Sequence, residues 1–305
     1  MNRLDKARLR RVVSREVKRA LREDAVPEKI DKKLFPTKLS AVDKSAAKAL
    51  ATGGHNDNHP DDDTSEAKKV SKPASQLKAS QTTMDFGKFV GMAIQMLGKT
   101  GSFSNGAGGD LGAIVSSDGH IMDGHHRWAA TLMVDPKAPV GGLLVNLPGE
   151  KLVGVLNVWT AAHGQSGKPS DTDLSSLSGE VVAKKFVDMA TKGGKFLPSP
   201  EEILESFKKN GFDNIEDAAD HVKKNWDATA GARKVQGWMP PKVDMPAIEP
   251  EQLAQVAKDI NSGKMDINPP YSPDVKAILG VEESRRQRSD AVLLERWHKL
   301  AGIIK

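Results

Sequence analysis

The pattern of apolar and polar positions predicts a small mixed domain near the middle of the chain. The expected elements are a helix over residues 86–97, strands over 113–115 and 120–122, a helix over 128–133 and a strand over 142–147. Gly98 is a plausible end for the first helix. The two short strands flank an Asp118-Gly119 turn, which is typical of a β-hairpin. Short strands mixed with helices indicate an α+β domain, which we place at residues 68–165.

A basic helical arm is expected before this domain, at residues 1–44. Between residues 3 and 22 there are nine basic and two acidic side chains. Leu9, Val13, Val17 and Leu21 recur every four residues, which makes one apolar stripe along a helix. Such an arm could bind nucleic acid or another anionic surface. The alternative is a solvated helix that docks its narrow stripe on another helix or subunit.

Residues 45–67 are expected to form a disordered linker, because they contain almost no large apolar side chain. His55 and His59 have the spacing of two metal ligands on one helix face. However, Gly53-Gly54 before them and Pro60 after them break a helix, and a metal site needs ligands that are held rigidly. A polar linker is therefore the preferred interpretation.

The region over residues 166–305 is mostly helical by pattern. Pro200-Glu201-Glu202 is a favourable helix start, because proline suits the first turn and acidic side chains oppose the positive helix end. A final amphipathic helix is expected over residues 293–304, preceded by a group of arginines.

Composition narrows the function classes. The net charge of +5 permits nucleic-acid binding without requiring it. The chain has no cysteine, which excludes disulfides, cysteine-ligated metals and thiol catalysis. No apolar run is long enough to span a bilayer, and the basic N-terminus lacks the apolar segment of a secretory signal. We therefore expect a cytoplasmic protein with no membrane partner.

The most informative stretch is Asp123-Gly124-His125-His126-Arg127, at a strand-to-helix turn. Backbone amides at a helix start favour anions, and Gly124 has no side chain to keep an anion away. Arg127 offers a fork of donors that suits phosphate oxygens, and histidines can carry protons near neutral pH. Asp123 could act as a base or as a metal ligand. The alternative is a purely structural role, in which these residues cap the helix and their basic side chains pair with acidic side chains at the surface.

This stretch resembles the signature of the ParB/sulfiredoxin superfamily. The similarity is strongest to its D-G-H-H-R branch, which includes phage proteins described as ParB-like nucleases and a free-serine kinase. Upstream, residues 75–81 resemble the opening of ParB-type domains, where a strand and a short polar motif precede the first helix. The resemblance covers residues 68–165. It implies a small ParB/sulfiredoxin-like fold, a phage source, host cytoplasm as the location, and Gln81 as a phosphate-binding residue.

Departures from the family pattern limit the chemistry. Chromosome-partitioning ParB proteins carry G-E-R-R here and bind CTP, whereas His125 and His126 replace the Glu and the first Arg. Sulfiredoxins carry a catalytic cysteine at the position of His125. The serine-kinase branch shares Asp123 through Arg127, which implies nucleotide-dependent phosphate transfer. The implied cofactors are Mg²⁺ and a nucleoside di- or triphosphate.

Two other segments resemble phosphate-binding motifs but do not meet the requirements of those motifs. Residues 93–100 fit only the loosest P-loop pattern, and they lie at the end of an apolar helix instead of in a glycine-rich turn after a strand. Residues 106–112 lack the third glycine of a dinucleotide fingerprint, because Leu111 occupies its place. This glycine-rich stretch is expected to be a flexible loop beside the site that could fold over phosphates.

Three functions remain open. The first is a phosphotransferase or nucleotide hydrolase, with Asp123 as base or Mg²⁺ ligand and His125 as proton carrier. In it, Gly124, His126 and Arg127 form the phosphate cradle. The second is a DNA-binding module or metal-dependent nuclease held on DNA by the basic terminal helices. The third is a non-catalytic structural or assembly protein of a phage, in which self-assembly into oligomers is expected.

Overall fold

The computed structural model describes the central part of the chain and short stretches near its ends. The residues described are 30–53, 67–164, 169–170, 172–194, 196–247, 250–267, 271 and 276–278. The helices expected over residues 3–22 and 293–304 lie outside these residues, as do His55 and His59.

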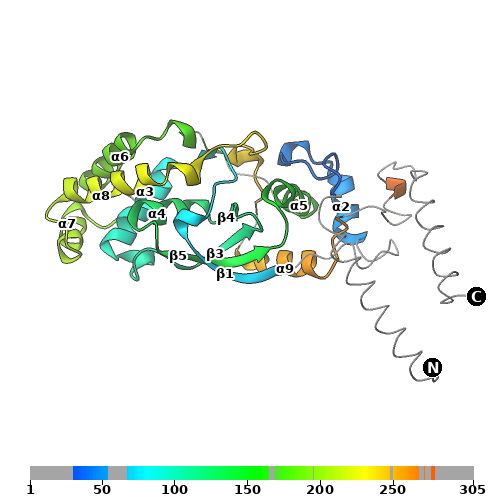
Figure 1. Ribbon diagram of the computed structural model, residues 1–305, viewed down its shortest axis with the longest axis horizontal. Helices are drawn as coiled ribbons and strands as arrows, with labels where there is room; N and C mark the ends of the chain where they lie inside the picture. The colour runs from blue at the N-terminus through cyan, green and yellow to red at the C-terminus, as the bar shows by residue number, and fades with distance from the viewer. Residues whose placement is uncertain are drawn as a thin grey trace, which may run out of the picture.

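Helices alternate with short strands, which confirms the expected α+β class (Figure 1). In chain order the elements are α2 (Lys44–Gly53), β1 (Ala67–Pro73), β2 (Thr83–Met84), α3 (Phe86–Gly98), β3 (Gly109–Ser116), β4 (Ile121–Asp123), α4 (His125–Val134), β5 (Pro139–Val145), α5 (Gly149–Ala162), β6 (Thr172–Asp173), α6 (Gly179–Lys192), α7 (Pro200–Lys209), α8 (Ile215–Ala228) and α9 (Pro250–Asn261). No described helix is long and apolar enough to cross a membrane.

The main sheet has the strand order β1-β5-β3-β4. Strand β5 pairs antiparallel with β1 and parallel with β3, and β3 pairs antiparallel with β4 across the expected hairpin. The pairing of β3 with β5 shifts register between Asp110 and Ala113. This bulge leaves Leu111 and Gly112 without partners in the β5 ladder, between the paired residues Asp110 and Ala113.

A close backbone contact explains the glycine pair in β5. A Cβ atom on Gly142 would lie 2.0 Å from the carbonyl oxygen of Ala113, in the neighbouring strand. No side chain fits at that distance, so only glycine allows the two strands to approach here. The position of the bulge in β3 therefore depends on Gly142.

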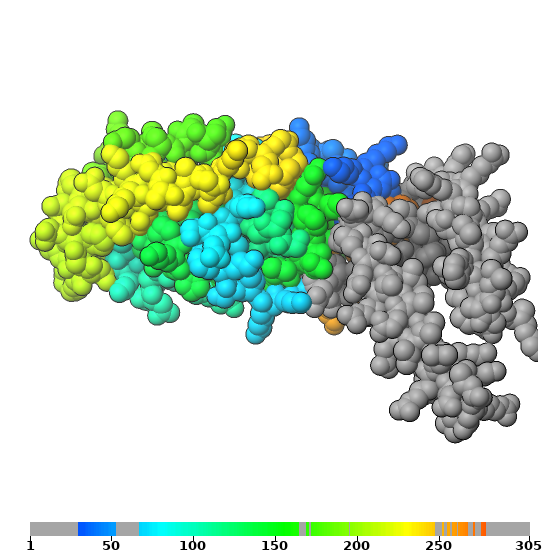
Figure 2. All heavy atoms as spheres, in the orientation of Figure 1, coloured from blue at the N-terminus to red at the C-terminus, as the bar shows by residue number. Residues whose placement is uncertain are grey.

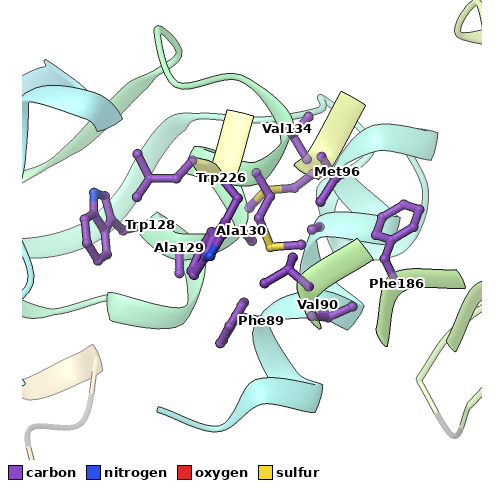
Figure 3. Close-up of a cluster of buried hydrophobic side chains, with 14 of the residues drawn as sticks. Phe89, Val90, Met96, Trp128, Ala129, Ala130, Val134, Phe186 and Trp226 are labelled. Carbon is purple, nitrogen blue, oxygen red and sulfur yellow. The ribbon is translucent and has the colours of Figure 1, made fainter. Parts of the chain in front are cut away.

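One hydrophobic core lies between the sheet and helices α3, α4, α6 and α8. Figure 3 shows its centre, where Phe89 of α3 faces Trp226 of α8. The two rings stack with centroids 5.6 Å apart, and the Trp226 indole donates a hydrogen bond to the Leu177 carbonyl. Because Phe89 lies before residue 165 and Trp226 after it, the packing does not follow the expected domain boundary.

The second core includes α2, α5 and α9, and it corrects the expectation of a disordered linker for residues 45–53, whereas residues 54–66 lie outside the described residues. Residues 44–53 form α2, whose Ala47 and Leu50 are fully buried, and α2 packs along α5. The alanine-rich sequence lowers the apolar signal but lets two helices approach closely. Ile30 and Phe35, in the expected basic arm, are also buried in this core.

The C-terminal helices confirm the expected helix start at Pro200. The Ser199 hydroxyl accepts a hydrogen bond from the Glu202 amide, and the Glu202 carboxylate accepts one from the Ser199 amide. This reciprocal pair satisfies two amides that would otherwise lack partners. Helices α6 to α8 pack on α3 and α4, and in Figure 2 their atoms (green to yellow) form a continuous surface with the rest of the coloured residues.

A fragment of residues 68–165 should fail to melt cooperatively, whereas residues 30–267 should melt as one unit. Without α6 and α8, the fragment would expose Phe89 and the apolar faces of α3 and α4. Thermal melts followed by circular dichroism would test this, with the full chain as the reference. A sharp transition of the short fragment near that of the full chain would contradict the shared core.

Candidate functional site

The D-G-H-H-R segment forms a tight turn between β4 and α4. Gly124 caps the helix with a φ of +90°, a left-handed conformation that side-chain-bearing residues rarely adopt. Its carbonyl accepts the first helical hydrogen bond, from the Trp128 amide at 2.9 Å. No side chain caps the first turn of α4. The amides of His125, His126 and Arg127 therefore remain available to an anion.

His125 is buried and joins the start of α4 to the polar motif upstream. Its Nε2 lies 3.0 Å from the Ser80 hydroxyl oxygen, and that hydroxyl donates at 2.5 Å to the Ile121 carbonyl. Because the Ser80 proton is used there, the His125 Nε2–H must be the donor. Burial, with the charges of His126 and Lys242, lowers the pKa of His125 to about 3. The ring is neutral at pH 7, and its role as proton carrier stays a prediction.

His126 lies among cations that come from three parts of the chain. Its Nε2 accepts a hydrogen bond from the Asp85 amide at 3.3 Å, which joins the starts of α3 and α4. Burial, followed by the positive charges of Lys242, Lys88 and Arg127, lowers the pKa of His126 to about 3. Three cations around one neutral imidazole make a site that favours negative charge.

Arg127 and Asp123 are neighbours on one side of the turn. An Arg127 Nη2 lies 3.4 Å from the Asp123 Oδ2, and about a third of each side chain is exposed, 32% and 35%. A long, half-exposed pair of this kind contributes little to stability. The Arg127 Nε is buried without an acceptor among the described residues. The guanidinium therefore keeps unused hydrogen-bonding capacity.

Gln81 follows Ser80 in the motif upstream and is 3% exposed. Its amide nitrogen has no acceptor among the described residues. The side chain does not line the cavity next to Arg127, so its predicted contact with phosphate stays a prediction.

A cavity of about 1290 Å³ lies next to this turn. Its walls are the first half of α3, the glycine-rich stretch before and within β3, Arg127, and the segment between α6 and α7. The glycine-rich stretch thus lies beside the site, as expected from the sequence. By contrast, the loose P-loop pattern falls in buried helix α3, as its apolar sequence indicated.

Sequence reasoning missed Lys88, Lys242 and the segment after α6. Lys88 carried a usable signal, because it lies in the first turn of a helix, where its charge opposes the helix dipole just as that of Arg127 does. Lys242 had no such signal, since only the tertiary fold brings its charge to His126.

Comparisons with protein-family models, with curated proteins and with solved structures found no match. The ParB/sulfiredoxin resemblance therefore rests on the sequence motifs alone.

Stability should decrease as the pH falls below about 6.5, partly because His125 and His126 are neutral in the fold. Their folded pKa values, about 3, lie below the ordinary value of 6.5, so unfolding takes up protons between these limits. Each histidine then adds a slope of up to about 1.4 kcal/mol per pH unit. His126→Gln keeps an acceptor for the Asp85 amide and should flatten the decline between pH 6 and 5. Urea unfolding at several pH values measures the free energy of unfolding of the wild type and of the variant. Equal slopes of this free energy against pH in the two proteins would contradict a neutral His126 in the fold.

Proposed function

We propose that the chain binds a nucleoside di- or triphosphate at the start of α4 and acts as a ParB-like phosphotransferase or nucleotide hydrolase. The observation that carries this proposal is that Lys88 and Arg127 line one cavity, and that their charges, with that of Lys242, act on the neighbouring His126. Positive charges that act together on a neutral, partly buried imidazole favour an added anion, beyond the Asp123 carboxylate that already lies 3.4 Å from Arg127. Phosphate groups fit because they offer several charged oxygens to amides and cations at once.

The uncapped first turn of α4 and the unpaired Arg127 Nε support phosphate as the anion. Both supply N–H donors, and the cavity beside Arg127 leaves room for the rest of a ligand. Lys88 adds a flexible point charge at the start of α3, a helix whose first turn the Asp85 carboxylate caps by accepting a hydrogen bond from the Lys88 amide at 2.9 Å.

Asp123 is the residue that we assign to the chemistry, as a base or as a ligand of Mg²⁺. The described residues hold no group of three or more His, Asp or Glu side chains that could bind a metal by themselves. Asp123 beside a phosphate cradle still fits Mg²⁺, which usually takes one or two carboxylates together with phosphate oxygens. The ion would neutralise charge on the transferred phosphoryl group. Asp123 would orient the acceptor hydroxyl or water and take its proton.

The DNA-associated and assembly alternatives depend on the basic segments at the two ends of the chain. These segments lie outside the described residues, so both alternatives stay predictions. Salt-sensitive DNA binding with cleavage would favour a nuclease, whereas self-assembly without nucleotide turnover would favour a structural protein.

Arg127→Ala should weaken the binding of inorganic pyrophosphate and of ADP about ten- to a hundredfold, with little change in melting temperature. The variant removes charge-assisted hydrogen bonds to phosphate but only a long, half-exposed ion pair from the fold. Calorimetric titration measures the affinity for each ligand, and thermal melts measure the melting temperature. Lys209→Ala is the matched control, because Lys209 also pairs with an acid four residues earlier. A large fall in melting temperature with unchanged binding would make Arg127 a structural residue.

Asp123→Asn should reduce nucleotide turnover strongly while ADP binding in the absence of metal stays within a few-fold of the wild type. The substitution keeps the shape of the side chain but removes the charge needed to accept a proton or hold Mg²⁺. Phosphate release with excess Mg²⁺ measures turnover, and titration without Mg²⁺ measures binding. Wild-type turnover in the variant would remove Asp123 from the chemistry.

A further inference from the structure

The cavity has two chemically different ends. Lys88 and Arg127 line one end together with Asp85, close to the cations that act on His126. Met92, Met189 and Leu197 supply apolar surface further along. A ligand that carries phosphates at one end and a flat apolar group at the other would match both ends.

Helix α3 sets the distance between these ends, because one of its faces forms a wall of the cavity. Lys88 and Gln95 both line it, and they are two turns apart on the same face. Seven residues at the helical rise correspond to about 10 Å. This spacing is comparable with the reach of the sugar that separates the phosphates of a nucleotide from its base.

Two glycines on the cavity side of α3 keep this space open. Gly87 and Gly91 both line the cavity, four residues apart. A Cβ atom on Gly87 would approach only the Asp85 carboxylate, at 3.8 Å, so packing does not require glycine there. Glycine inside a helix is unfavourable. Room for a ligand explains its use at Gly87, whereas a Cβ on Gly91 would touch the Met189 side chain at 3.4 Å.

Phe196 lies at the apolar end of the cavity and is 79% exposed. The other exposed large apolar side chains among the described residues are the aliphatic Val181, Val243 and Ile278. The Phe196 carbonyl accepts a hydrogen bond from the Gln95 side-chain amide at 2.8 Å, which fixes the segment to α3. An aromatic ring presented in this way is a platform for another flat ring.

We propose that Phe196 is a specificity-determining residue that stacks on the base of a nucleotide whose phosphates lie at Lys88 and Arg127. The proposal rests on the proposed function and adds the place of the base. It also gives the segment between α6 and α7 a direct role in ligand recognition. Stacking on an aromatic side chain accepts any base, so the platform selects nucleotides over inorganic phosphates.

The test compares ADP with inorganic pyrophosphate on the full chain by calorimetric titration. Phe196→Ala should weaken ADP binding about tenfold or more, the usual size of one lost stacking contact. Pyrophosphate binding should stay within twofold of the wild type, because it makes no contact with the base platform. Phe196→Tyr should restore ADP affinity. Val181→Ala, another exposed apolar truncation outside the cavity lining, is the control and should change neither ligand.

The outcomes separate the two proposals. Pyrophosphate binding in the wild type with no tighter binding of ADP would overturn the base platform and leave the phosphate site standing. Equal losses for both ligands in Phe196→Ala would also overturn it, since the ring would then act through the fold. If the wild type binds neither ligand, the proposed function is wrong, and the proposal that Phe196 stacks on a base is wrong as well.

Discussion

The hydrogen bond from the Asp85 amide to the His126 ring holds the first turns of α3 and α4 together. It requires a neutral imidazole, because a protonated ring has no acceptor. Burial and the nearby cations keep the ring neutral, because both disfavour its protonated form. The same cations therefore preserve the hydrogen bond from the Asp85 amide. An anion placed among Lys88, Lys242 and Arg127 would relieve their repulsion and ease this constraint on His126. Binding of the proposed ligand and protonation of His126 would therefore be coupled through the same contact.

The turn that places His126 there depends on glycine and on a buried hydrogen-bond chain. Gly124 allows the left-handed start of α4, and the His125 ring donates a hydrogen bond to Ser80, whose hydroxyl in turn donates to Ile121 at the start of β4. The polar motif upstream thus fixes the start of α4 to the start of β4 through Ser80. This arrangement leaves His125 facing the interior and His126 facing the cations, so two adjacent histidines have different surroundings.

Local sequence patterns predicted the elements around the site well, because the hairpin, α3 and α4 each have a clear apolar period and end at glycine or a turn. The order of the sheet could not be predicted in this way. Its centre depends on the approach of Gly142 to Ala113, a contact between strands separated by a helix. Helix α2 was missed because its buried face is largely alanine. Lys242 was missed because nothing local marks its position near His126.

Helix α3 connects the core to the site, since Phe89 faces Trp226 while Lys88, next to it in the chain, faces the cavity. Helices α6 and α8 pack on α3 and α4, and the segment after α6 is fastened to Gln95. The wall that carries Phe196 therefore keeps its place only while the shared core is intact. A chain reduced to the motif-bearing region would retain Asp123 through Arg127 but lose one wall of the cavity. On the proposed function, phosphate recognition and base recognition would come from different parts of the sequence, and the Phe89–Trp226 contact would help to hold them in one structure.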